Sequence, residues 1–174
     1  MTKYNYAFKA DKENVVKTVG RDIALSPKAA IEICKFVKGK SVEKARGILE
    51  LVKEEKLAVP YTRATNGAGH KPGKVGPGKY PFKGAVEFLK LLKQLEANAQ
   101  NKGLSSSLTI IHACTQRAAE PSRYGRKRRV QVKRCHVELA AMEAEEKKAR
   151  APKAKAAKKE GHEAAKENNT QVNQ

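Results

Sequence analysis

The sequence contains no tryptophan, few aromatic residues and no long apolar run. No window is long enough to span a bilayer, and the residues that follow Met1 do not resemble a signal peptide. Three cysteines are present, and none of them forms a Cys-x-x-Cys pair. An odd number of cysteines without that spacing is typical of reduced thiols in the cytosol. We therefore expect a cytoplasmic protein with no membrane partner.

A catalytic set and a metal-binding motif are also missing. The cationic regions hold no clustered carboxylates, and one of the four histidines, His162, lies near the C-terminus. His112 and Cys114 are expected to share a strand face opposite Cys135 and His136, but the last two are neighbours and point to opposite faces. The short paired ligand spacing of structural zinc sites is absent. The sequence therefore predicts no enzyme activity, no metal, no cofactor and no small-molecule substrate.

Acidic residues are outnumbered throughout, with 37 Lys and Arg against 18 Asp and Glu and a net charge of +19. Residues 1–142 carry 29 basic and 12 acidic residues, which is +17, whereas residues 143–174 carry 8 and 6, which is +2. The charge thus belongs to the part with apolar periodicity, which favours a nucleic-acid partner over generic solubility. The Lys, Ala and Glu-rich tail, 143–174, has no apolar face and is predicted to be mobile.

Two segments rich in β-branched and apolar residues, 108–115 and 130–139, indicate strands. Their connection contains turn formers, and the stretch from Arg117 to Arg134 holds eight basic residues and one acid, Glu120. So much like charge cannot pack on the protein's own core. The pattern therefore predicts a long β-hairpin over residues 107–139 that projects from the domain.

Capping residues and helical spacing predict three helices. The first begins at Ser26-Pro27 and ends at Gly39, and the second begins at Ser41 and ends near Lys56. The third spans residues 83–102 and stops at Gly103. With a weakly strand-like segment before the first helix, broken by a glycine, the expected fold is α+β: three helices packed on a small antiparallel sheet, with the hairpin projecting from it.

Two further stretches have an unusual composition. Residues 60–82 hold five glycines and four prolines, and no acid occurs between Glu55 and Glu87. This predicts an irregular loop whose backbone amides and lysines contact phosphate. It is not a nucleotide-binding P-loop, because Val75 stands where that motif requires Ser or Thr. The N-terminal extension, 1–14, alternates aromatic and basic residues, which favours equally an arm that stacks on bases and a strand that lies on the domain, 15–142.

Specific motifs accompany this organisation. Residues 70–83 read His-Lys-Pro-Gly-Lys-Val-Gly-Pro-Gly-Lys-Tyr-Pro-Phe-Lys, and residues 20–28 read Gly-Arg-Asp-Ile-Ala-Leu-Ser-Pro-Lys. Together with Arg-Tyr-Gly-Arg at 123–126 and Cys-His-Val-Glu at 135–138, they resemble the large-subunit ribosomal protein twenty-two family in its archaeal and eukaryotic form. The resemblance implies a domain that binds large-subunit ribosomal RNA near the outer end of the nascent-chain tunnel, with a hairpin that lines the tunnel wall. Neighbouring large-subunit ribosomal proteins and the nascent polypeptide are the other partners that it implies.

The candidate site residues follow from the charge and from the resemblance. The predicted rRNA-binding residues are Arg21, Lys28, Arg63, His70, Lys71, Lys74, Lys79, Tyr80, Lys83, Arg117, Arg123, Arg126, Lys127, Arg128, Arg129, Lys133 and Arg134. The predicted tunnel-lining residues are Pro121, Ser122, Arg123, Tyr124, Gly125 and Arg126. Charge alone also allows a free-standing, chromatin-like nucleic-acid-binding protein, or a chaperone or scaffold for acidic proteins, whose binding would lack the salt dependence of nucleic-acid contacts.

Overall fold

The structure, a computed structural model, describes residues 4–9, 14–126 and 130–143. All of them belong to one compact unit, Met1–Ala144. The described elements are, in order, β1 (Val15–Ile23), α1 (Pro27–Val37), α2 (Val42–Lys53), β2 (Val59–Pro60), β3 (His70–Lys71), β4 (Gly76–Lys79), α3 (Phe82–Asn101), β5 (Leu108–Arg117) and β6 (Cys135–Glu143). The mobility predicted for the tail concerns residues that, except for Glu143, lie outside this description.

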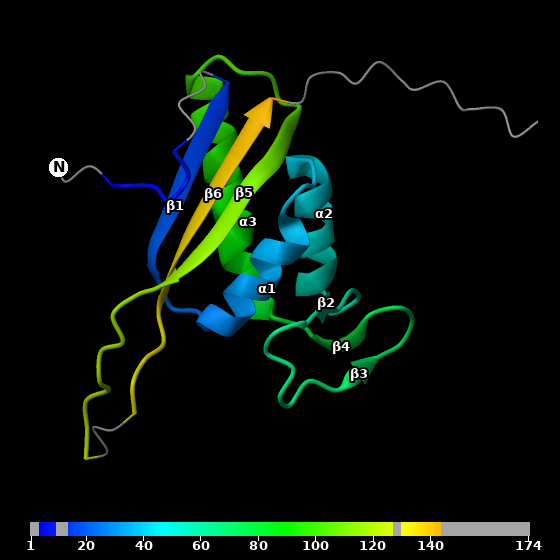
Figure 1. Cartoon of the computed structure of the whole chain (residues 1–174), viewed down its shortest axis with the longest axis vertical. Coiled ribbons are helices and arrows are strands. Elements are labelled where there is room, and N and C mark those ends of the chain that lie inside the picture. Colours follow the sequence, from blue (N-terminus) through cyan, green and yellow to red (C-terminus); the bar gives the residue numbers. More distant parts are fainter. Residues whose placement is uncertain (1–3, 10–13, 127–129, 144–174) are drawn as a thin grey trace, which may run out of the picture. The chain divides into compact units, whose positions relative to one another are not determined.

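The main sheet has the order β1-β6-β5, and both pairings are antiparallel (Figure 1). The last strand of the described chain is therefore the central one. Val16 pairs with Ala141 on one side of it, and Ile110 pairs with Ala141 on the other. β1 passes through Gly20 without ending, although its register shifts between Gly20 and Ile23. The break expected at this glycine is thus only an irregularity within one strand.

The helices cover one face of this sheet and build the core with it. α3 contacts β1, α1 contacts β5, and α2 packs on α3. The largest fully buried apolar side chains come from all of these elements: Phe88, Ile33, Leu49, Leu92, Leu95, Leu108, Ile110 and Leu139. α3 approaches α1 closely at Gly84, where an added Cβ would lie 2.5 Å from the Ile33 Cδ1 atom. The core is therefore continuous from the sheet to α2.

The helix predictions agree with the structure. Within the described residues there are three helices, and each begins and ends within a few residues of the expected position. The Ser41 side chain accepts a hydrogen bond from the backbone N–H of Lys44, as a capping serine should, whereas Ser26 makes no such bond. The α+β class is confirmed. None of the described helices is both long and apolar enough to cross a bilayer.

The prediction that residues 60–82 form no regular structure is wrong. Here β4 pairs with both β2 and β3, which gives a second small antiparallel sheet. Gly73 and Gly76 adopt positive φ angles of 79° and 67°, and these let the chain reverse between β3 and β4. Glycine and proline oppose strand formation locally, but backbone pairing with β2 overrides that preference. We call residues 60–82 the loop hairpin.

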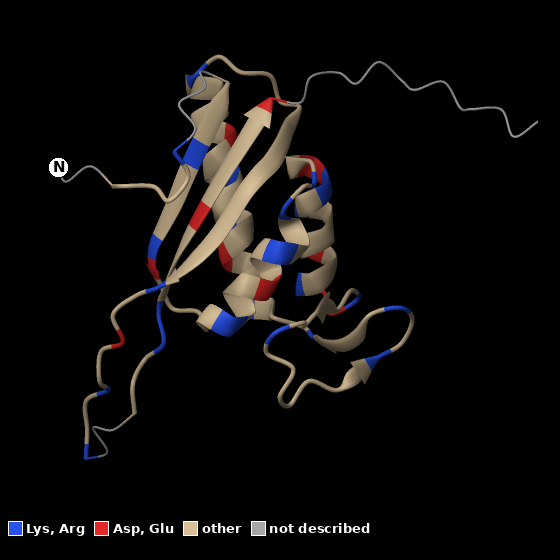
Figure 2. Ribbon diagram, viewed as in Figure 1, with Lys and Arg blue, Asp and Glu red and all other residues tan. Residues whose placement is uncertain are grey.

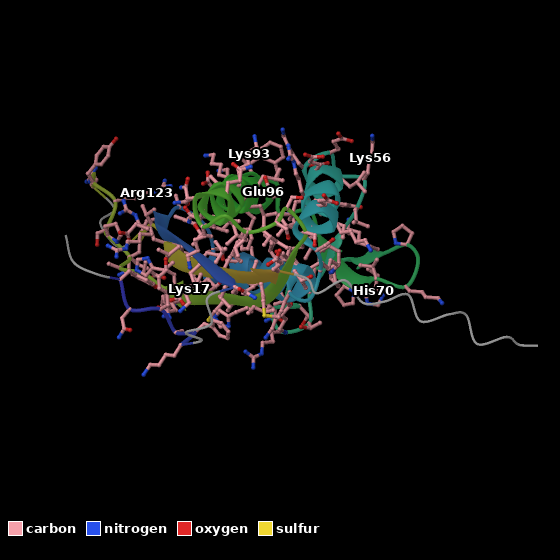
Figure 3. All side chains as sticks on the ribbon, turned by 90° about the horizontal axis from the view of Figure 1, so that it is seen from above. Lys17, Lys56, His70, Lys93, Glu96 and Arg123 are labelled. Atoms are coloured by element: carbon pink, nitrogen blue, oxygen red, sulfur yellow. The ribbon has the colours of Figure 1, made fainter. Side chains whose placement is uncertain are left out.

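The N-terminal segment lies on the sheet face that the helices leave open (Figure 3). The carboxylate of Glu138, 1% exposed, accepts hydrogen bonds from the Tyr4 hydroxyl at 2.6 Å and from the Ala7 backbone N–H at 2.9 Å. The Phe8 ring stacks on His112 with 5.1 Å between the centroids. Burial and the bond to Glu138 raise the pKa of Tyr4 to about 12. For residues 4–9, the structure therefore favours the segment that lies on the domain over the base-stacking arm.

Candidate nucleic-acid interface

A cationic arm leaves the main sheet after Arg117 and returns at Cys135 (Figure 1). We use the term arm for residues 118–134. Three backbone hydrogen bonds join its two sides, from Ala118 N to Arg134 O at 3.2 Å, from Val132 N to Pro121 O at 2.9 Å and from Arg123 N to Val130 O at 2.8 Å. These bonds are spaced too widely for a regular strand pair.

The return strand therefore starts later than predicted, at Cys135 instead of Val130, and runs on to Glu143 instead of ending at Leu139. Beyond the last strand pair, only a single bridge between Ser122 and Gln131 has strand character among the described arm residues. A continuous hairpin over 107–139 remains a prediction. Repulsion among the arm's basic residues and the proline at its start both oppose regular pairing.

The arm is exposed along its described length. Residues 121–126, all of the predicted tunnel-lining set, are exposed, and Tyr124 is 100% exposed. Figure 2 shows basic residues along both sides of the arm and one acid, which is Glu120. Glu120 Oε1 lies 3.2 Å from Arg117 Nε at the arm's base. The predicted residues Lys127, Arg128 and Arg129 lie outside the described part.

The loop hairpin forms a second cationic projection, and Figure 2 shows basic residues and no acid along it. The Lys71 Nζ atom lies 4.7 Å from the centroid of the Tyr80 ring, and Lys79 Nζ lies 5.5 Å from that of Tyr61. These contacts hold the two ammonium groups over aromatic faces without neutralising them. Lys74, in the turn between β3 and β4, is exposed, and so is His70, which Figure 3 labels on the same projection.

A buried carboxylate attaches the loop hairpin to α1. Glu32 is 2% exposed, and its Oε1 atom accepts the Arg63 backbone N–H at 2.8 Å, while Oε2 accepts the Thr62 hydroxyl at 3.1 Å. Burial raises the pKa of this carboxyl, but the hydrogen bonds from Arg63 and Thr62 outweigh burial and leave the pKa below its ordinary value. The ionised Glu32 therefore fixes the first residues of the loop hairpin against the helix.

The structure gathers the predicted residues at one end of the sheet. The arm and the loop hairpin leave from this end on either side of the first turn of α1, which carries Lys28 (Figure 1). Arg21 is near the arm's base, since Ile23 pairs with Cys135, and its guanidinium lies 4.8 Å from the Tyr4 ring centroid. The remaining described residues divide between the projections: Arg63, His70, Lys71, Lys74, Lys79, Tyr80 and Lys83 follow the loop hairpin, and Arg117, Arg123, Arg126, Lys133 and Arg134 follow the arm.

Sequence reasoning missed the residues that hold these projections in place. Glu32 and Glu138 are both buried and both accept hydrogen bonds from segments distant in the sequence. Nothing local distinguishes them from surface glutamates. The only signal is their setting, since Glu32 adjoins the apolar stripe of α1 and Glu138 lies between Val137 and Leu139 on a strand.

The cysteines do not form a site. Among the residues that the structure describes, no group of three or more His, Cys, Asp or Glu side chains could hold a metal ion. Cys34 and Cys135 are buried, and Cys114 is half-buried. Burial raises the pKa of Cys34 to about 12 and that of Cys135 to about 11. Both thiols are therefore protonated at neutral pH as well as covered.

We expect a maleimide reagent to label at most Cys114 in the folded protein at pH 8, and all three cysteines after denaturation. Thiolates are the reactive form, and burial withholds both the thiolate and access at Cys34 and Cys135. Mass spectrometry of the labelled protein counts the modified sites. The Cys114→Ser variant is the control and should remain unlabelled until it unfolds. Rapid native labelling of Cys34 would contradict the packing of α1 on β5.

The fold and the site define a small basic α+β domain that presents two cationic projections at one end of its sheet. Residues 18–142 match the family model described as Ribosomal protein L22p/L17e. The chain belongs to this family, which confirms the resemblance seen in its motifs.

Curated archaeal relatives agree with the family model. The chain is 37% identical to a protein of Thermofilum pendens over 151 residues, which cover 83% of this chain and 100% of the relative. It is 41% identical to a protein of Archaeoglobus fulgidus over 128 residues, covering 71% and 83%, and 39% identical to one of Cenarchaeum symbiosum over 153 residues, covering 83% and 100%. All three relatives are named large ribosomal subunit protein uL22.

Proposed function

We propose that the protein is a structural, non-enzymatic constituent of the large ribosomal subunit in the cytoplasm, where it binds ribosomal RNA and contacts neighbouring ribosomal proteins. The observation that carries this proposal is the family match over residues 18–142, together with the two cationic projections at one end of the domain. Exposed basic segments without apolar faces have no partner within the described chain. They require a polyanion to neutralise them.

The RNA contacts are proposed to be made by the arm, the loop hairpin and the first turn of α1. Lysine and arginine side chains on these segments address phosphate, and Tyr80 and Tyr124 offer rings to unstacked bases. The N-terminal aromatic residues contribute less, because Tyr4, Tyr6 and Phe8 are half-buried against the sheet. Recognition of this kind depends on shape and charge more than on base sequence.

The tip of the arm is proposed to line the nascent-polypeptide exit tunnel, with residues 121–126 facing the nascent chain. Two observations support this assignment. The tip is fully exposed, and it contains no acid among residues 121–126. Basic side chains at such a wall would meet a passing chain while the flanking cations hold RNA.

Sedimentation of the tagged protein through a gradient at high salt tests the proposal. A ribosomal constituent co-migrates with the large subunit, because the folded RNA surrounds it and many contacts must break together. A free-standing nucleic-acid-binding protein, the alternative that the net charge of +19 favours, moves to the free pool as salt screens its contacts. Binding that ignores salt would instead indicate a chaperone or scaffold for acidic proteins.

The Lys71→Glu, Lys74→Glu, Lys79→Glu variant is expected not to enter the large subunit, because it reverses three charges on an acid-free projection. The measurement is the fraction of tagged protein that co-sediments with the subunit. The matched control reverses Lys44, Lys53 and Lys93, which are exposed on α2 and α3 and lie away from both projections. Normal incorporation of the loop variant would mean that this hairpin contacts a protein neighbour or has only a structural role.

A further inference from the structure

A cavity of about 590 Å³ lies between the first two turns of α1 and the base of the loop hairpin. Its lining residues come from three segments of the chain. Ser26, Lys28, Ala29, Ile31 and Glu32 belong to α1 and its cap, Tyr61, Arg63, Ala64 and Asn66 to the chain after β2, and Lys79 to β4. The cavity therefore opens between the arm and the loop hairpin, at the end of the sheet where the basic residues gather (Figures 1 and 2).

The cavity is positively charged. Lys28, Arg63 and Lys79 line it, and in the described part of the chain none of the three forms an ion pair. The one acid in the wall, Glu32, is already engaged by the Arg63 backbone N–H, by Thr62 and by Lys35, whose Nζ lies 3.8 Å from its Oε2. Lys79 Nζ contacts only the Asn66 carbonyl, at 3.4 Å, and the Tyr61 ring. Three cations thus remain available for an anion that enters.

The rest of the wall suits a flat organic group. Ala29, Ile31 and Ala64 supply apolar surface, and the Ser26 hydroxyl and the Asn66 amide supply donors and acceptors at the rim. Pockets that enclose small organic ligands have volumes of roughly 300–1,000 Å³, and this cavity falls within that range. A site that combines apolar walls, amide groups and several cations fits a base joined to a phosphate.

The geometry points to a nucleotide site: this cavity receives one unpaired nucleotide of the large-subunit ribosomal RNA. Its phosphate lies among Lys28, Arg63 and Lys79, and its base lies against Ile31 and Ala64. This inference rests on the proposed function and specifies one contact within it. RNA favours such a site because proteins read single-stranded RNA by taking bases that are splayed out of the helix. The cations of the arm and of the loop hairpin continue on either side, as a strand that enters and leaves requires.

The test blocks the cavity without changing its charge. The Ala64→Phe variant places a ring where the base would lie, and Ala97→Phe, on the exposed surface of α3, is the matched control. The probe is large-subunit ribosomal RNA transcribed in vitro and incubated with the full-length chain. We expect the wild type to protect one unpaired base from chemical modification, Ala64→Phe to expose that base again, and the affinity to fall by about tenfold, the scale of one lost stacked base. The control should behave as the wild type.

A second variant keeps the inference testable if Ala64→Phe does not fold. Asn66 is exposed at the rim, so a benzoylphenylalanine in its place does not disturb the core. In assembled subunits this photoreactive group should crosslink to one ribosomal RNA nucleotide. A crosslink to a ribosomal protein instead would overturn the inference.

The outcomes separate the inference from the function on which it rests. If the wild type binds the RNA and neither Ala64→Phe nor a Lys28→Gln, Arg63→Gln, Lys79→Gln variant changes any protected base, the nucleotide site is wrong and the ribosomal role remains. If the wild type itself does not bind ribosomal RNA, both are wrong. In the supported case, the glutamine variant also lowers the salt dependence of binding, by roughly 0.7 for each phosphate contact removed from single-stranded RNA.

Discussion

A protein in which Asn-Gly replaces residues 118–134 is expected to fold and to enter the large subunit, but to lose its contact with the nascent chain. Arg117 and Cys135 are the last register pair of β5 and β6, so a two-residue turn can join them directly. Among the described residues removed, only Ala118 is buried, at 8% exposure. The thermal midpoint should therefore remain close to that of the wild type.

The functional loss follows from charge and reach. The replaced segment carries seven basic residues and one acid, and it includes the whole predicted tunnel-lining set. Each phosphate contact that disappears lowers the salt dependence of RNA binding by about 0.7 to 0.9. The loop hairpin and the first turn of α1 are untouched and should still direct assembly. Crosslinks between a stalled nascent chain and this protein should fall to background.

The length of the arm and its chemistry are separated by a matched variant. Arg123→Ser, Tyr124→Ser and Arg126→Ser keep the length but remove the charge and the ring at the tip, so crosslinks should persist while stalling by tunnel-sensing peptides weakens. A shortened protein that fails to assemble would make the arm an assembly anchor. A shortened protein that assembles with normal nascent-chain crosslinks would show that the tip does not line the tunnel.

Glu32→Ala is expected to lower the free energy of unfolding by about 2 kcal/mol, the range for hydrogen bonds to a buried charged group. The carboxylate is 2% exposed and accepts from both Arg63 and Thr62, so its loss frees the start of the loop hairpin from α1. Chemical denaturation measures the stability, and hydrogen exchange at the Arg63 amide measures the local release. Lys35→Ala is the control, because that side chain is 46% exposed and its ion pair should contribute little.

The same residue predicts a dependence on pH. The folded pKa of Glu32 lies below its ordinary value, so its contribution is present above the ordinary carboxyl pKa and is lost as the pH falls through the lowered value. The stability difference between the wild type and Glu32→Gln should therefore shrink in acid and be largest near neutral pH. A constant difference across that range would mean that Glu32 is not ionised in the folded protein.

Local patterns predicted the helices well because caps and apolar spacing are properties of neighbouring residues. Ser41 and Gly103 mark helix ends where the structure has them. The order of the main sheet could not be predicted in this way, since β1 and β5 both pair with β6, far along the chain. The loop hairpin was missed for the same reason. Its glycines and prolines were interpreted by local preference, and its pairing with β2 is not local.

The site divides along the same line. Composition was enough to identify the cationic segments, because charge needs no partner to be visible. It could not show that Lys28, Arg63 and Lys79 line one cavity, or that Glu32 is consumed by backbone and hydroxyl donors. The N-terminal segment shows the limit most clearly. Its aromatic residues suit RNA equally well, and only the contact between Tyr4 and Glu138 assigns them to the sheet.

The central position of β6 also fixes the order in which the molecule can be completed. β1 is translated first and β5 much later, yet neither has its sheet partner until residues 135–143 have been made. Tyr4 likewise waits for a carboxylate 134 positions further on. Contacts of such long sequence separation slow folding, so the newborn chain passes through a stage with its strand edges and most of its positive charge unprotected. A ribosome that lacks Cys135–Glu143 in its product releases helices without a sheet.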